Sequence, residues 1–172
     1  MREFVTQIGE AFVGTGAEAA HLNTVLGAKG GPVETAWVTA LATPRVGHIA
    51  FVTTLRPGVP AKPMTLFVNK ATLDGDVHST MTWGPGQAGV ASGVLWAVAD
   101  GIIAADAVDD LVLVAAVWVS PAAVDETLVY ENNRTATREA LAAGARQLPS
   151  LDEAMEFRDR ALNAYYLPKG IT

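Results

Sequence analysis

The residues with the clearest chemical potential begin with a histidine and an asparagine in residues 20–27, AHLNTVLG. Apolar and polar residues alternate there and a glycine closes the run, which predicts a short β-strand. Side chains on a strand point to opposite faces in turn, so His21 and Asn23 share one face, about 7 Å apart. From this stretch alone, the default interpretation is an ordinary half-buried strand with a hydrogen-bonded histidine. The rest of the chain decides whether the pair is functional.

A lysine on another predicted strand, residues 64–73, is the next candidate. Lys70 shares a strand face with Val68 and Thr72, so it has an apolar neighbour. A partly desolvated lysine has a lowered pKa and could form a Schiff base with a carbonyl substrate. A lysine that reaches solvent from an edge strand fits the same pattern. Both interpretations remain open at this point.

A glycine-rich segment, residues 84–89, matches G-x-G-x-x-G and leads into a predicted helix over residues 89–99. A dinucleotide fingerprint needs a buried strand directly before it, an acidic residue about twenty positions later and a surrounding βαβ unit. The upstream stretch is short and no second Rossmann half follows, which disfavours nucleotide binding. The segment is better interpreted as a tight helix start that brings backbone amides and the Gln87 carboxamide close to a polar ligand.

Composition excludes several classes of function. Only 17% of the 172 residues are charged and half are hydrophobic, so the chain is expected to fold as one domain over residues 1–172. The net charge of −6, with no basic cluster, argues against nucleic acid or an anionic membrane as partner. The chain has no cysteine, and its three widely spaced histidines match no zinc motif, so no metal is predicted.

The N-terminus lacks the pattern of a signal peptide, and the longest apolar run, residues 111–119, is about half a membrane span. These features predict a soluble, cytoplasmic protein. Its high alanine and valine content indicates more apolar surface than one small core needs, and hints at subunit interfaces.

The elements that must position the candidate residues follow from periodicity and from Gly and Pro boundaries. Strands are predicted over residues 4–13, 20–27, 48–55, 64–73 and 111–119, and helices over residues 33–41, 89–99, 125–145 and 151–165. Gly9 is a possible β-bulge within the first strand. Because strands and helices intermix without strict alternation, we expect an α+β two-layer sandwich rather than a doubly wound sheet.

Several motifs, in one order along the chain, resemble the formaldehyde-activating enzyme family. They are residues 9–14 (GEAFVG), 20–23 (AHLN), 32–36 (PVETA), 62–66 (KPMTL), 69–72 (NKAT), 83–91 (WGPGQAGVA), 99–103 (ADGII) and 109–111 (DDL). The resemblance is collinear from about residue 7 to 145, and a divergent helical tail follows from about residue 149. It implies a mixed β-sheet packed by helices, with a left-handed βαβ crossover.

The resemblance also implies a reaction: formaldehyde condenses with tetrahydromethanopterin, the co-substrate, to give 5,10-methylene-tetrahydromethanopterin and water. This is a carbon–oxygen lyase reaction of methylotrophic one-carbon metabolism and formaldehyde detoxification, with no permanently bound cofactor. The family's proposed general acid falls on His21. Its pterin contacts fall on Asn23, Val52, Lys70, Thr72 and Gln87. Family members form homopentameric rings with each pterin site between neighbouring subunits.

Three positions depart from the family's pattern. Asn23 stands where aspartate is usual, Val52 where leucine is typical, and Ala88 where some members have histidine. An amide cannot carry the negative charge that an aspartate would place near the imidazole. The favoured hypothesis is the enzyme, and the alternative is a non-catalytic pterin- or formaldehyde-binding paralogue with a sensing or carrier role.

Overall fold

The computed structural model describes residues 4–163 and residue 166, and its centre is a five-stranded mixed sheet. The strand order is β1-β2-β7-β6-β3. These strands are β1 (Gln7–Val13), β2 (Ala20–Ala28), β3 (Phe51–Val52), β6 (Met64–Asn69) and β7 (Leu111–Trp118). Only β6 and β7 pair in parallel, and the chain between them crosses over through helices.

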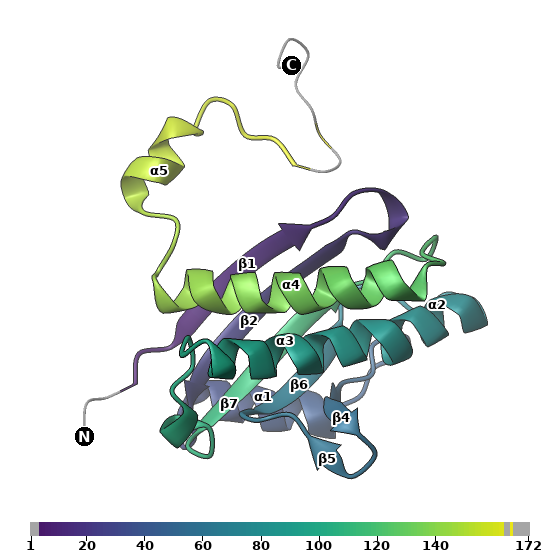
Figure 1. Ribbon diagram of the computed structural model, residues 1–172, viewed down its shortest axis with the longest axis horizontal. Helices are drawn as coiled ribbons and strands as arrows, with labels where there is room; N and C mark the ends of the chain where they lie inside the picture. Colours follow the sequence, from purple (N-terminus) through teal and green to yellow (C-terminus); the bar gives the residue numbers. More distant parts are fainter. Residues whose placement is uncertain (1–3, 164–165, 167–172) are drawn as a thin grey trace.

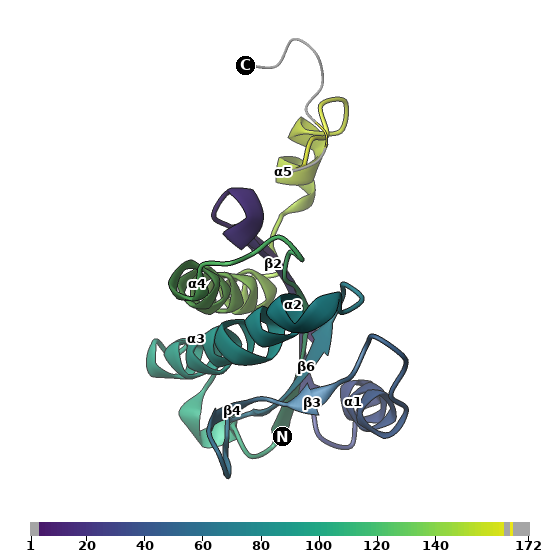
Figure 2. The same cartoon turned by 90° about the vertical axis from the view of Figure 1, so that its right-hand side faces the viewer.

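Helices cover the two faces of this sheet unequally. Helices α3 (Gln87–Ala99) and α4 (Glu126–Ala145) lie side by side across one face (Figure 1). Leu22, Phe67 and Leu113 are fully buried in the core between them and the sheet. Helix α1 (Pro32–Ala42) packs on the opposite face against β2 and β7 (Figure 2). The predicted α+β sandwich is confirmed, and α1 leaves part of the second face open.

Helix α4 lies unusually close to β1, and Gly9 makes that approach possible. A Cβ at Gly9 would lie 1.8 Å from the carbonyl oxygen of Ala140. The pairing of β1 with β2 runs without a shift through Gly9 and Thr24, so the β-bulge predicted at Gly9 is wrong. The glycine is there because a helix backbone packs on it, which strand periodicity cannot reveal.

The glycine-rich segment does not begin a helix, as the sequence predicts, but lies within a continuous helical stretch. Helix α2 (Gly75–Met81), which the sequence analysis missed, runs through a π-helical turn (Thr82–Gly86) directly into α3. Pro85 lies inside that turn, and a Cβ at Gly86 would approach the carbonyl oxygen of Met81 to 3.0 Å. Proline cannot donate its backbone hydrogen bond within a helix, and the wider turn accommodates it.

Three other predicted elements are shorter than expected. The strand predicted over residues 64–73 ends with β6 at Asn69, so Lys70 and Thr72 lie beyond it. The strand predicted over residues 48–55 is divided into β3 and β4 (Thr54–Arg56), and β4 pairs only with β5 (Val59–Pro60). The last helix, α5 (Leu151–Glu156), has a capping box at Ser150 but ends well before residue 165. Residues 157–163 are not helical, and residues 164 and 165 lie outside the described part. No helix in the described part is long and apolar enough to cross a membrane.

Candidate functional site

The candidate site lies on the sheet face opposite α3 and α4, at the end that α1 leaves uncovered. At the covered end, Val25 and Val114 line a pocket together with Val33 of α1. Toward the start of β2, the antiparallel register places Phe12 of β1 and Trp118 of β7 on either side of His21. Cross-strand partners have side chains on the same face, so these three form a row across the open end of the sheet.

His21 is held by a carboxylate from the neighbouring strand. The Nε2 atom of His21 lies 3.0 Å from a carboxylate oxygen of Glu10, and the two side chains are 37% and 58% exposed. The ring of Phe12 lies against the imidazole, with 5.9 Å between ring centroids. This contact between Nε2 and Glu10 restrains the ring orientation and leaves Nδ1 as the nitrogen that can face a substrate.

Lys70 joins this group from the other side of β7. It follows β6 directly, and its backbone N–H donates to the carbonyl oxygen of Val117 at 2.8 Å. Its ammonium donates to the side-chain oxygen of Asn23 at 2.5 Å, although the two residues are 47 positions apart in sequence. Partial burial lowers the pKa of Lys70, and the negative charge of Glu10 acts in the opposite direction.

Glu10 is the functional candidate that the sequence analysis missed. In the β1–β2 register it is the direct partner of Asn23, the position where the family's carboxylate is lacking. A carboxylate therefore faces His21 from β1, whatever residue stands at position 23. The sequence did place Glu10 and Phe12 on one face of a predicted strand. Only the pairing register shows that this is the face that carries His21.

Thr72 lies at the margin of this group. Its hydroxyl is 3.2 Å from Nε2 of His48, whose Nδ1 is 3.0 Å from the carbonyl oxygen of Asn69. These contacts connect the segment after β6 to the loop that precedes β3. Thr72 thus has a partner in its own chain, two residues beyond Lys70.

Val52 and Gln87 lie away from His21. Val52 is on edge strand β3, which β7 and β6 separate from β2, a span of about 14 Å at ordinary strand spacing. Gln87 begins α3, in the helix layer behind the sheet. It is buried, and its side-chain oxygen accepts from the backbone N–H of Thr54 at 2.5 Å. Within one chain, the structure brings together His21, Asn23 and Lys70, but not these two.

The arrangement suits proton transfer and the orientation of a polar ligand. An imidazole oriented by a carboxylate can deliver a proton to a departing oxygen. An ammonium and a carboxamide beside it offer hydrogen bonds to polar ligand atoms. No cluster of three or more His, Asp or Glu side chains that could hold a metal ion occurs in residues 4–163 and 166.

Comparisons with known proteins identify relatives of this chain. Residues 8–166 match the family model described as formaldehyde-activating enzyme (Fae). The chain is 38% identical over 156 residues to a 5,6,7,8-tetrahydromethanopterin hydro-lyase of Methanosarcina barkeri, covering 91% of this chain and 88% of that protein. It is also 38% identical over 156 residues to a bifunctional enzyme Fae/Hps of Methanosphaera stadtmanae, again over 91% of this chain but only 38% of the longer relative.

Proposed function

Because this chain belongs to the formaldehyde-activating enzyme family, a family of lyases, we propose that it condenses formaldehyde with tetrahydromethanopterin to 5,10-methylene-tetrahydromethanopterin and water. The observation that carries the proposal is the open sheet face on which Glu10 orients His21 beside the Asn23–Lys70 pair. The name of the relative from M. barkeri supports the choice of pterin and the loss of water.

His21 acts at the step where water leaves. A secondary amine of the reduced pterin adds to formaldehyde and gives a carbinolamine. Hydroxide is a poor leaving group, so the C–O bond breaks readily only when the oxygen is protonated as it departs. A positioned general acid typically accelerates such a step by about 10²- to 10⁴-fold. The bridging carbon then bonds to the second pterin nitrogen, and the released proton goes to solvent.

Glu10 and Lys70 have supporting roles in this mechanism. Glu10 holds Nε2 of His21, so Nδ1 points toward the substrate, and its carboxylate supplies the negative charge that Asn23 lacks. Lys70 and Asn23 form a polar pair that binds carbonyl and amino groups of the pterin. Engagement of the Lys70 ammonium by Asn23 favours this ligand-holding role over a Schiff base with formaldehyde.

The complete site forms between two copies of the chain. The six residues predicted from the resemblance divide into the His21 group and the distant pair Val52 and Gln87, and this separation supports a site to which a second copy contributes the pair. A homopentameric ring of cytoplasmic subunits, each with a left-handed crossover between β6 and β7, provides such a site. Exposed apolar side chains such as Ile8 and Val38, 66% and 52% exposed, supply surface for such contacts.

The decisive experiment measures methylene-tetrahydromethanopterin formation by purified protein against the spontaneous reaction. We expect acceleration by the wild-type chain and loss of about 10²-fold or more in His21→Asn, which retains a hydrogen-bonding side chain but no titratable ring. Glu139→Gln on α4, an exposed position, serves as the control and should match the wild type. No acceleration by the wild type, or full activity in His21→Asn, rejects the mechanism.

A non-catalytic pterin- or formaldehyde-binding role is the second candidate, and the amide at Asn23 favours it. Titration calorimetry with tetrahydromethanopterin separates the two. Tight binding without turnover supports a sensor or carrier, whereas turnover that depends on His21 rejects it.

A further inference from the structure

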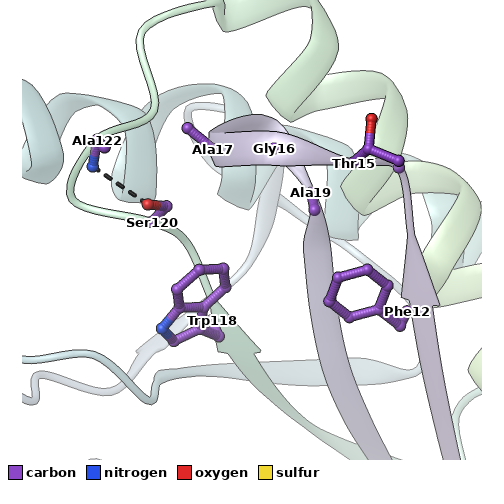
Figure 3. Close-up of a pocket in the computed structure, with 9 residues that line it drawn as sticks. Phe12, Thr15, Gly16, Ala17, Ala19, Trp118, Ser120 and Ala122 are labelled. Atoms are coloured by element: carbon purple, nitrogen blue, oxygen red, sulfur yellow. Dashed lines mark hydrogen bonds between the residues drawn. The ribbon is translucent and has the colours of Figure 1, made fainter. Parts of the chain in front are cut away.

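A cavity of about 580 Å³ lies at the start of β2, and its lining includes Ala19, two residues before His21. Its walls are the rings of Phe12 and Trp118, which flank His21 in the strand register. Figure 3 shows these two rings on either side of the start of β2, beneath the loop that carries Thr15 and Ala17. The volume lies within the range of about 300–1,000 Å³ found for small-molecule pockets.

The lining of this cavity contains no ionisable side chain. Besides the two aromatic rings, it consists of Gly14, Thr15, Gly16, Ala17, Ala19, Ser120 and Ala122. The small side chain of Ala19, two residues before His21, leaves the space open between the rings. Ser120 accepts from the N–H of Ala122 at 3.2 Å, so its own hydroxyl hydrogen remains for a ligand. Such a lining suits a flat, uncharged aromatic group.

The two sides of His21 therefore differ in chemistry. Along β2, Asn23 and its partner Lys70 lie about 7 Å to one side of His21, and Ala19 with the aromatic walls lies about 7 Å to the other. The carbon from formaldehyde bridges two nitrogens of tetrahydromethanopterin, one in the reduced pterin ring and one attached to an aryl ring. An acid that serves this reaction must lie between a polar heterocycle and an apolar ring.

We propose that the cavity of Phe12 and Trp118 binds the aryl ring of the pterin co-substrate, while Lys70 and Asn23 hold its polar pterin ring, with His21 between them. This subsite rests on the proposed function and adds the orientation of the co-substrate to it. The aryl ring stacks between the two aromatic walls, and its amine nitrogen faces Nδ1 of His21. The walls contribute to recognition and not to proton transfer.

The test uses two pterins and two wall variants. Phe12→Ala and Trp118→Leu should each raise the Kd of tetrahydromethanopterin about fivefold, the effect expected for losing one aromatic contact. For 6-methyltetrahydropterin, which has no aryl ring, Kd should stay unchanged in both variants. In the condensation assay KM should rise with little change in kcat, because the aromatic walls bind the aryl ring and take no part in the proton transfer from His21.

Trp96→Leu is the matched control. Trp96 is 43% exposed on α3, where it stacks on Arg134 in the helix layer behind the sheet, so its loss should leave both affinities unchanged. Phe12→Leu provides a milder wall variant if Phe12→Ala does not fold, as judged by circular dichroism, and it should raise Kd in the same selective way.

Two results overturn the subsite. One is an unchanged Kd and KM for tetrahydromethanopterin in both wall variants of an active enzyme. The other is a wall variant that dissociates the assembly in native mass spectrometry and shows no selective rise in the Kd of tetrahydromethanopterin. That result would mean that a second copy of the chain covers the cavity. Failure of the proposed function looks different, because the wild type itself would neither accelerate condensation nor bind either pterin.

Discussion

Glu10→Gln is the most informative single substitution, because it removes the charge beside His21 and preserves the size of the side chain. The carboxylate lies 3.0 Å from Nε2 of His21, and both side chains are substantially exposed. At that distance, two unit charges in a medium as polar as water attract by about 1.4 kcal/mol. Exposed ion pairs measure about 0.2–1 kcal/mol, because solvent screens them and side-chain entropy opposes them.

These energies set the expected effect on catalysis. With about 1 kcal/mol at stake between Glu10 and the protonated ring, Glu10→Gln should lower kcat roughly fivefold and leave KM within about twofold. Glu10→Asp retains the charge, but it is one methylene too short to keep the contact, and should give an intermediate kcat. The assay is steady-state formation of methylene-tetrahydromethanopterin, corrected for the spontaneous rate.

Salt provides an independent check on the electrostatic explanation. At about 1 M ionic strength the Debye length is near 3 Å, comparable to the distance between Glu10 and His21, so the advantage of the wild type over Glu10→Gln should shrink. Glu139→Gln removes the same charge from α4 and should leave kcat unchanged at every salt concentration. A Glu10→Gln enzyme whose kcat equals that of Glu139→Gln would refute the role given to Glu10.

Three further predictions concern the same face and its support. Asn23→Asp should change kcat less than Glu10→Gln does, since Glu10 already supplies a carboxylate beside His21. In the Glu10→Gln background, Asn23→Asp should restore kcat. Failure to restore it would mean that a carboxylate at position 23 on β2 cannot act on His21. Glu10→Gln should also lower the pKa of Lys70 further, because the negative charge that raises this pKa is removed. Lys70 should then react with formaldehyde and borohydride at lower pH than in the wild type. An unchanged pH dependence of that reaction would contradict this. Gly9→Ala should cost about 3 kcal/mol of unfolding free energy in urea, whereas Gly84→Ala, with open space around its Cβ position, should stay within about 1 kcal/mol; equal losses would refute the packing argument.

Much of the fold follows from local sequence. Alternation and apolar runs predict β1, β2 and β7 closely, and Asp125 caps α4 through the N–H of Leu128, as its residue type suggests. The same local rules fail over residues 75–86, where the sequence predicts no helix before the helix start at the glycine-rich segment. There the chain is helical, because a π-helical turn accommodates Pro85. Periodicity also could not distinguish a bulge at Gly9 from close packing under α4.

The sequence determined the residue types of the site, and the tertiary structure decided which of them lie next to one another. Periodicity placed His21 and Asn23 on one face, and motif order singled out Lys70. Only the pairing of β1 with β2 places Glu10 against His21, and only the order β2-β7-β6 lets Lys70 reach Asn23 across 47 positions. Strand pairing is a non-local choice set by burial of the opposite face, so no pattern within one strand can reveal it. A carboxylate therefore faces His21 from the neighbouring strand, which the identity of residue 23 alone does not indicate.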